Sequence, residues 1–248
     1  MIMAVKKNVI LVHGFLESES MWSELLQNTS SRLAFHTIAL PGHKGGSEVL
    51  PDELSGYADY ISKKLDEHKI KDAFLVGHSM GGYCCLDFAK RYSYRVKGIC
   101  LFHSSAAEDG PEKKQSRLNA MDLIRENKSA YIKTLLTSVF AIKNREKFKE
   151  QITTLCENAG TMKEEAIIAA QNAMMNREGS VEFLKERQFP LFYYVGQHDE
   201  LLPQEKMLKE IQSIPGSLVH FSESAGHMGQ YEDTLDAFGF LKRIVRAY

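Results

Sequence analysis

The chain has 248 residues, of which 44% are hydrophobic and 25% are charged, and its formal net charge at pH 7 is -1. This length suits one α/β domain with a substantial core, and the composition is typical of a soluble globular protein. The near-zero charge gives no general argument for a nucleic-acid or acidic-membrane partner. No apolar run approaches the roughly 18 residues that a membrane-spanning helix needs.

The amino-terminal stretch MIMAVKKNVILVHGF passes directly from two lysines into an apolar run. It lacks the apolar region and small-residue cleavage site of a secretion signal. The four cysteines form no C-x-x-C pair, and they are Cys84, Cys85, Cys100 and Cys156. Several lie among apolar residues, which is typical of buried free thiols in a reducing compartment. We therefore expect a cytoplasmic protein.

Apolar, β-rich runs recur along the chain with helical stretches between them. The runs that predict strands are 8–13, 35–40, 72–77, 96–103, 190–196 and 217–223. Their near-continuous hydrophobicity is typical of a parallel sheet that is covered on both faces. Helices are expected near 51–68, 80–93, 203–213 and 230–247. This alternation predicts a doubly wound α/β fold.

A long segment without strand signals interrupts the alternation between the fourth and fifth predicted strands. Residues 106–188 are rich in Lys, Glu, Met, Ala and Leu, in patterns typical of amphipathic helices. A structureless loop of this length is improbable in a compact domain. We therefore predict a core formed by 1–105 and 189–248, into which 106–188 is inserted as a helical unit.

The stretch FLVGHSMGGY, residues 74–83, places a serine between two glycines where an apolar strand should end and a helix begin. In a G-x-S-x-G motif, this setting produces a strained turn that lifts the serine hydroxyl above the sheet edge. The helix that follows adds unpaired N–H groups and a positive dipole end. Glycine and serine are also common in ordinary turns. The flanking strand and helix favour Ser79 as a catalytic nucleophile.

A serine nucleophile needs a histidine base and an acid that orients the base. In the chain order serine, acid, histidine, Asp199 follows one predicted strand and His227 follows the last. Each residue has a simpler interpretation, because Asp199 could cap the next helix and His227 could be an ordinary loop histidine. Glu200 and Asp109 remain alternative acids. Together, Ser79, Asp199 and His227 predict a catalytic triad.

The developing oxyanion requires two backbone N–H donors. One belongs to the residue after the serine, which is Met80. The loop HGFLES after the first strand should supply the second from Phe15, with Gly14 permitting a tight turn. Seen alone, the HG pair could equally be an ordinary turn.

The segments LVHGF, PGHKGGS, VGHSMGG, GQHDELLP and AGHMGQYED resemble successive motifs of the α/β-hydrolase superfamily. The resemblance covers most of the chain and is weakest in 106–188. It implies a mostly parallel sheet of about six strands flanked by helices, with 106–188 as a helical lid. It also implies a serine hydrolase without a cofactor. Two departures, the missing Asp in ALPGH and the YED segment, do not touch the predicted triad.

Histidines gather after the predicted strands. Those concerned are His13, His43, His78, His103, His198 and His227. A metal site must be considered, but no H-E-x-x-H or comparable ligand spacing is present. We expect these histidines to act mainly as hydrogen-bonded loop anchors, with no metal ion bound.

The inserted segment should decide the substrate, and here the sequence says less. Its apolar residues include Met121, Phe140, Met162, Met174 and Met175, which could line an acyl pocket or pack the helices against the core. As pocket residues we select Gly14, His103, Phe140 and Met228. Acidic and basic residues are nearly balanced in this segment, so we expect the substrate to be an uncharged small-molecule ester of small or medium size. The predicted activity is that of a carboxylesterase.

Related chemistries remain open. Perhydrolases and C–C bond hydrolases resemble the same site, and the lyase of menaquinone synthesis has GxSMGGR where this chain has Tyr83 in place of the arginine. A slow-turnover ligand-sensing receptor or a non-catalytic scaffold is a different class. A receptor should be modified about once by an activated ester, whereas an enzyme should cycle.

Overall fold

The computed structural model describes residues 7–27 and 33–247. The expectation of no secretion signal depends in part on residues 1–6, which lie outside the described residues. Six strands form one sheet in the order β2-β1-β3-β4-β5-β6, and each neighbouring pair is parallel. The strands are β1 (Lys7–Val12), β2 (Leu33–Ile38), β3 (Ala73–His78), β4 (Val96–Phe102), β5 (Leu191–Gly196) and β6 (Ser217–Ser222). This confirms the predicted sheet.

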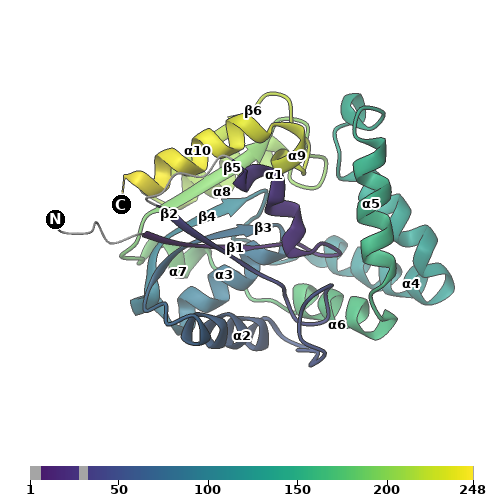
Figure 1. Cartoon of the computed structure of the whole chain (residues 1–248), viewed down its shortest axis with the longest axis horizontal. Coiled ribbons are helices and arrows are strands. Elements are labelled where there is room, and N and C mark those ends of the chain that lie inside the picture. The colour runs from purple at the N-terminus through teal and green to yellow at the C-terminus, as the bar shows by residue number, and fades with distance from the viewer. Residues whose placement is uncertain (1–6, 28–32, 248) are drawn as a thin grey trace.

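Helices cover both faces of the sheet (Figure 1). One apolar cluster joins the sheet to α2 (Leu54–Glu67), α3 (Met80–Arg91) and α8 (Gln204–Ser213). A second cluster joins it to α1 (Ser23–Leu26) and α10 (Thr234–Arg246). The side chains of β1 alternate between the two clusters, which explains why the strand sequences are apolar throughout.

The spacing of apolar residues along a long helix determines which of its faces packs against the sheet. The buried side chains of α10 recur at intervals of three and four residues, and they are Ala237, Phe240, Leu241, Ile244 and Val245. Such a stripe lies on one face of a helix and packs against the sheet. The shorter turns are η1 (Glu19–Trp22), η2 (Ser93–Arg95), η3 (Ile142–Asn144) and α9 (Gly229–Glu232).

The inserted segment 106–188 is helical, as predicted. Its helices are α4 (Pro111–Ser138), α5 (Lys149–Gly160), α6 (Glu164–Met175) and α7 (Val181–Lys185). Figure 1 shows α4, α5 and α6 beyond one end of the sheet. In contrast, α7 places Leu184 in the same cluster as α2 and α3. The role of this segment as a lid stays a prediction, as do its boundaries.

Helix α4 changes direction at Asn127, whose backbone angles of φ -155° and ψ 82° are not helical. The side-chain oxygen of Asn127 accepts a hydrogen bond from the N–H of Ala130 at 3.0 Å. Asparagine is among the residues that most favour capping the start of a helix in this way. Asn127 therefore ends one half of α4 and caps the other.

The two connections between the inserted segment and the core are bound together. The N–H of Ser180 donates to the carbonyl of Ala106 at 2.7 Å. Beside this contact, the buried carboxylate of Asp109 pairs with Arg177 at 2.8 Å and with Arg117. Burial alone would raise the pKa of Asp109, but the neighbouring arginines hold it below its ordinary value. A backbone hydrogen bond and buried ion pairs therefore hold together the two ends of the inserted segment.

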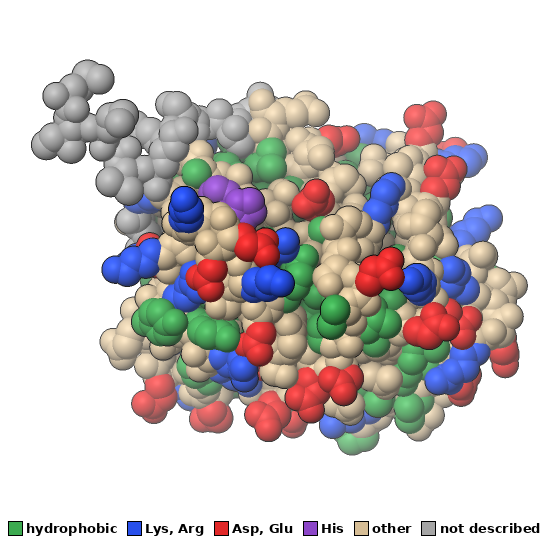
Figure 2. Space-filling view, turned by 60° about the horizontal axis from the view of Figure 1, so that its bottom comes forward, with side chains coloured by type: hydrophobic (Ala, Val, Ile, Leu, Met, Phe, Trp, Pro, Cys, Tyr) green, Lys and Arg blue, Asp and Glu red, His purple; other side chains and the backbone are tan. Residues whose placement is uncertain are grey.

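The surface carries both signs of charge. Figure 2 shows acidic and basic side chains interspersed over one face of the molecule. Among the described helices, none has the combined length and apolar character required to cross a bilayer. The four cysteines are free thiols, and Cys84, Cys85 and Cys100 are buried while Cys156 is half-buried.

Candidate active site

Ser79 occupies a sharp turn between β3 and α3. Its backbone angles are φ 49° and ψ -116°, a conformation that residues other than glycine rarely adopt. The turn is held by the Ser79 N–H, which donates to the carbonyl of Phe102 at 3.0 Å, and by Ser104 Oγ, which donates to the Ser79 carbonyl at 2.7 Å. Backbone strain that is held in place by such contacts is typical of functional sites.

The glycines around Ser79 allow the backbone segments to approach closely. A Cβ atom at Gly77 would collide with the carbonyl of Gly81. A Cβ atom at Gly81 would collide with the carbonyl oxygen of Val12 in β1. The turn and the neighbouring strand therefore fit together only when both positions lack a side chain, which accounts for the spacing of the motif.

Asp199 and His227 meet beyond the ends of β5 and β6. The Nδ1 atom of His227 lies 2.7 Å from Asp199 Oδ2, and each residue is 4% exposed. The other carboxylate oxygen, Oδ1, accepts the N–H groups of Leu201 at 2.9 Å and Leu202 at 3.0 Å. Asp199 thus stabilises its own loop and binds the imidazole. Burial would raise its pKa, but His227 and His103 hold it well below its ordinary value.

The second ring nitrogen of His227, Nε2, is buried and finds no hydrogen-bond partner in residues 7–27 and 33–247. The ring centre of His227 lies 5.1 Å from that of His78, the residue directly before Ser79. A buried nitrogen without a partner is uncommon in folded proteins. The structure therefore brings His227 close to the serine turn, with Nδ1 bound to the acid and Nε2 unpaired.

His103 supports Asp199 from a second side. It is fully buried and adopts a positive φ of 46° directly after β4. Its Nε2 accepts the N–H of Gly229 at 3.1 Å, so a neutral ring carries its proton on Nδ1, which lies 3.4 Å from Asp199 Oδ2. Burial lowers the pKa of His103 to about 4 despite the nearby carboxylate. His103 therefore contacts the acid, while its predicted role in a substrate pocket stays a prediction.

The loop after β1 lies against the serine turn. A Cβ atom built on Gly14 would be 3.2 Å from the Cβ of Ser79. The N–H of Gly14 is already bound by Glu17 Oε2 at 2.6 Å. The following N–H, from Phe15, and that of Met80 in the first turn of α3 are the predicted oxyanion donors, and first-turn N–H groups have no partner within their own helix. Their role stays a prediction.

The other residues selected from the sequence are the pocket residues Phe140 and Met228 and the alternative acids. Phe140 is 1% exposed and its ring centre lies 6.3 Å from that of Tyr231, while Met228 is buried in the same apolar cluster. Their assignment to a substrate pocket stays a prediction. Of the alternative acids, Glu200 is exposed and lies 3.5 Å from Arg145, and Asp109 belongs to the ion pairs that hold together the two ends of the inserted segment. Asp199 is the acid that contacts His227.

Three further buried residues have contacts at this site, and they are Glu17, His78 and Glu232. From the sequence, His78 was expected to be a hydrogen-bonded loop anchor, whereas Glu17 and Glu232 were not selected. Glu17 Oε2 lies 2.8 Å from His78 Nδ1, and His78 Nε2 lies 2.9 Å from the carbonyl oxygen of His227. Glu232 binds backbone N–H groups of the His227 loop. The motif GHSMG contained a signal for His78, because a polar side chain ends an otherwise apolar strand there.

One group within the described residues could offer three ligand atoms to a metal ion. His103, Asp199 and His227 bring such atoms within 4.8 Å of one another. These atoms already face one another, and the 2.7 Å contact between His227 and Asp199 is a hydrogen-bond distance. The contact between His227 and Asp199 is accounted for by a hydrogen bond, and the expectation that no metal ion binds stays a prediction.

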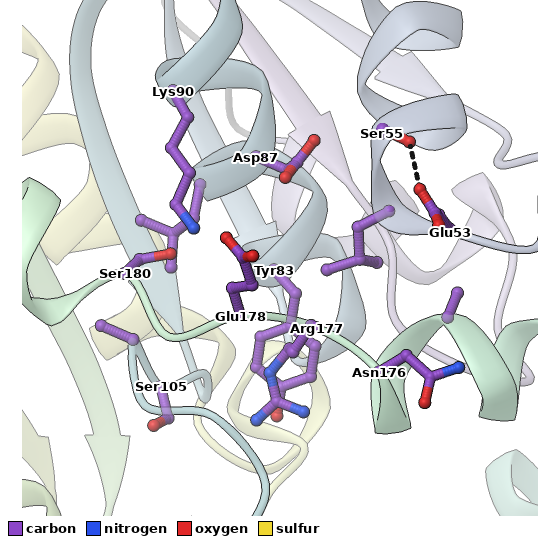
Figure 3. A pocket seen from close by; sticks show the side chains of 14 residues that line it. Glu53, Ser55, Tyr83, Asp87, Lys90, Ser105, Asn176, Arg177, Glu178 and Ser180 are labelled. Atoms are coloured by element: carbon purple, nitrogen blue, oxygen red, sulfur yellow. Dashed lines mark hydrogen bonds between the residues drawn. The ribbon is translucent and has the colours of Figure 1, made fainter.

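A separate cavity of about 290 Å³ lies beside α3. Figure 3 shows Asp87 and Lys90 of α3 facing it, with Arg177 against the ring of Tyr83. The guanidinium carbon of Arg177 lies 3.9 Å from that ring centre. The walls of this cavity come from α2, α3, α6 and the loops at the base of the insertion, and are distinct from the Ser79, Asp199 and His227 group.

Residues 7–234 match the model of a family described as the alpha/beta hydrolase fold. The match covers most of the chain, so the protein belongs to the alpha/beta hydrolase family. Together with the six-stranded parallel sheet, this confirms the resemblance noted in the sequence and places the protein in a family of hydrolases.

Curated relatives include esterases. The chain is 32% identical over 113 residues to a pimeloyl-[acyl-carrier protein] methyl ester esterase of Neisseria meningitidis, a region that spans 44% of this chain and 42% of that protein. The chain thus covers less than half the length of this relative. An uncharacterized carboxylesterase of Bacillus subtilis is 24% identical, over 89% of this chain and 73% of its own length. The 2-succinyl-6-hydroxy-2,4-cyclohexadiene-1-carboxylate synthase of Klebsiella pneumoniae is 21% identical, over 96% and 93% respectively.

Solved structures share the fold. A thermophilic esterase from Thermogutta terrifontis matches with a TM-score of 0.89 at 24% identity, covering 98% of this chain and 91% of that chain. An enol-lactonase from Burkholderia xenovorans matches with a TM-score of 0.87 at 18% identity, covering 98% and 92%. At these identities, the matches establish the architecture of the chain alone.

Proposed function

We propose that this hydrolase is a serine carboxylesterase that cleaves small to medium uncharged esters through an acyl-enzyme intermediate. The proposal rests on a strained Ser79 that directly follows His78, whose ring centre lies 5.1 Å from that of a buried His227. The Nδ1 atom of His227 is bound to Asp199 and its Nε2 atom is unpaired within the described residues. Such an imidazole has one nitrogen fixed by the acid and the other free to take a proton from the serine.

In the proposed reaction, His227 Nε2 removes the proton of Ser79 while Ser79 Oγ attacks the ester carbonyl. The carboxylate of Asp199 keeps the proton of the neutral ring on Nδ1 and stabilises the imidazolium that forms. His227 then donates its new proton to the departing alcohol. Water, deprotonated by the same histidine, attacks the acyl-enzyme and releases the acid.

The tetrahedral oxyanion would be bound by the N–H groups of Phe15 and Met80. Supporting this, Gly14 lies next to Ser79, and its own N–H is occupied by Glu17. The next N–H along the loop, from Phe15, is therefore the donor that we assign. Removal of one such donor in a comparable site lowers kcat by roughly 10² to 10³.

Segment 106–188 is proposed to act as a lid over this site. The carbonyl of Val139, directly after α4, accepts the N–H of His227 at 2.8 Å. The N–H of Ala141 donates to Glu232 at 2.9 Å. The inserted segment therefore contacts the histidine loop, as a cover of the substrate site would.

Arg177, the cation beside Tyr83, gives no argument for an anionic substrate. In the menaquinone-pathway lyases that the sequence resembles, an arginine helps to hold a carboxylate where this chain has Tyr83. Arg177 lies against Tyr83, but its guanidinium is engaged by Asp109 and by the carbonyls of Met174 and Ala107. The guanidinium of Arg177 is thus not available to bind a substrate anion.

The proposed location is the reducing cytoplasm, which the three buried thiols support.

The test is hydrolysis of p-nitrophenyl esters of increasing chain length, with a fluorophosphonate probe and a vinylogous diketone in parallel. Ser79→Ala should lower kcat by about 10³-fold or more and abolish labelling by the probe. The matched control is Ser116→Ala, because Ser116 is exposed on α4. Retention of more than about a tenth of wild-type activity in Ser79→Ala would contradict the proposal. Single labelling without turnover would favour a receptor, and preferred cleavage of the diketone a C–C hydrolase.

A further inference from the structure

A second buried pair lies behind the proposed triad. Glu17, in the loop after β1, is 4% exposed, and His78, the last residue of β3, is 1% exposed. His78 Nδ1 lies 2.8 Å from Glu17 Oε2, and His78 Nε2 lies 2.9 Å from the carbonyl oxygen of His227. Each nitrogen of the ring therefore faces an oxygen atom at hydrogen-bond distance.

These partners determine the protonation of the ring. A backbone carbonyl can only accept, so Nε2 must carry a proton. Glu17 Oε2 already accepts the N–H of Gly14 at 2.6 Å, as an ionised carboxylate does. If the carboxylate is ionised, Nδ1 must also carry a proton, and His78 is an imidazolium. The alternative is a neutral pair, in which a protonated Glu17 donates to Nδ1 of a neutral His78. Both arrangements hold the same number of protons, but the proton favours the ring because imidazole is ordinarily the stronger base by about two pKa units.

We propose that Glu17 and His78 form a buried carboxylate–imidazolium pair that positions the loops of the active site. The pair contacts the loop of the assigned oxyanion donor through Gly14 and the histidine loop through the His227 carbonyl. His78 also directly precedes Ser79 in the chain. One ion pair thus joins all three loops. The protonation state is independent of the reaction, whereas the effect on catalysis rests on the proposed function.

The groups around His78 support a cation at this position. Burial alone would lower the pKa of His78, but Glu17, the His227 carbonyl and Asp199 raise it above its ordinary value. Burial would raise the pKa of Glu17, but His78 and the Gly14 N–H hold it below its ordinary value. His103, whose ring centre lies 5.9 Å away, stays neutral because burial lowers its pKa to about 4.

The remaining neighbours of His78 are two aromatic side chains and two histidines. Trp22 packs edge-on against His78 with ring centres 6.5 Å apart, and Phe102 lies 6.1 Å away. His13 lies at the base of the same loop as Glu17, and burial lowers its pKa to about 3, so it is neutral too. The ring of His227, at 5.1 Å, is bound to the carboxylate of Asp199. Glu17 and Asp199 are therefore the charges that face the cation.

The pair has a defined pH range. Because the pKa of His78 is raised by folding, its contribution is fully present below the ordinary histidine value of about 6.5 and is lost as pH rises through the raised value. Because the pKa of Glu17 is lowered, its contribution is lost only as pH falls through that lowered value. We therefore expect catalysis to decline as pH rises through the raised pKa of His78 and the ring loses its proton.

The protonation state can be measured directly by long-range ¹H–¹⁵N NMR on the full chain. His78 is assigned by comparison with His78→Gln or, if that variant does not fold, through its bonds to assigned backbone atoms. Both ring nitrogens of His78 should carry protons at pH 6, below the ordinary histidine value. A bare ring nitrogen in the wild-type protein at pH 6 would overturn the proposal.

The positioning role is tested with Glu17→Gln, which removes the charge but preserves the shape. Glu19→Gln is the matched control, because Glu19 lies two residues further along the chain, at the start of η1, and is exposed. On p-nitrophenyl butyrate, Glu17→Gln should lower kcat about tenfold or more, as expected for a lost buried charge-assisted hydrogen bond, with KM changed less than about twofold. Its loss of activity with rising pH should begin at lower pH than in the control. Identical kcat–pH profiles in the two variants would overturn the role.

Amide hydrogen exchange separates this inference from the proposed function. In Glu17→Gln, exchange should become about tenfold faster at residues 13–17 and 225–229, because a lost contact of about 1.4 kcal/mol changes local opening by that factor. Unchanged exchange in both loops would overturn the positioning role even if the enzyme is active. If the wild-type protein hydrolyses no ester and Ser79 is not labelled, the proposed function fails, while the NMR and exchange results still decide the pair.

Discussion

Glu232 binds the backbone on both sides of His227. Its Oε1 atom accepts the N–H of Gly226 at 2.9 Å and that of Met228 at 3.2 Å. Its other oxygen accepts the N–H of Ala141 at 2.9 Å and the side chain of Asn144 at 2.7 Å. A single buried carboxylate therefore fixes the loop that carries the imidazole and joins it to the inserted segment.

Replacing Glu232 with Gln should disturb this loop. Glutamine has one acceptor oxygen, so its NH₂ group would face N–H donors on one side and leave them without partners. Each unpaired buried donor costs about 1 to 3 kcal/mol and each oxygen accepts two, so we expect the free energy of unfolding to fall by about 2 kcal/mol or more. Activity toward p-nitrophenyl butyrate should fall with it. Urea unfolding gives the stability, with the exposed Glu223→Gln as control. Equal midpoints in the two variants would show that the four contacts are not important for stability.

Gly14 is the second position where a small change should have a large effect. A Cβ atom there would lie 2.7 Å from both Glu17 Oε2 and His78 Nδ1. Alanine would therefore push the loop away from the serine turn and displace Phe15, the assigned oxyanion donor. We expect Gly14→Ala to lower kcat by about 10²-fold, the effect of losing one oxyanion-hole donor.

The control for this variant is Gly110→Ala, because a Cβ atom at Gly110 meets no atom within 4 Å in the described structure. Circular dichroism and urea unfolding of both variants show whether the fold persists. If Gly14→Ala keeps wild-type kcat while folded, Phe15 is not a donor whose position depends on this loop.

Much of the fold followed from local patterns. Strands buried on both faces are apolar throughout, so β1 and β3 to β5 were easily recognised, and their order of appearance predicted a parallel sheet. The predicted helix 230–247 instead contains a break at Asp233, whose angles are φ -147° and ψ 53°. The side chain of Asp233 accepts hydrogen bonds from Ser222 and Ser224. That break depends on a contact with the preceding strand and loop, which periodicity does not encode.

The residues of the candidate site divide in the same way. Ser79 has a local motif, and Asp199 and His227 follow strands, so the sequence pointed to all three, while their catalytic roles stay predictions. Glu17 and Glu232 are acidic residues without such a motif, and each is defined by partners far away in the sequence. These two carboxylates matter because folding buries backbone N–H groups and a ring nitrogen that need hydrogen-bond partners, and the sequence does not show which groups those will be.

Acid should destabilise the protein through three buried histidines. Burial lowers the pKa of His13 to about 3, of His43 to about 4 and of His103 to about 4, whereas each has an ordinary value of about 6.5 in the unfolded chain. Between these values the unfolded state binds more protons, so stability falls as pH decreases from about 6.5 toward 4. Each histidine contributes up to about 1.4 kcal/mol per pH unit. Urea midpoints at pH 7, 6 and 5 measure this slope. His43→Gln should reduce it by about a third of the histidine contribution, because one of three equivalent groups is removed. A slope in this variant equal to that of the wild-type protein would show that His43 is not held neutral by burial.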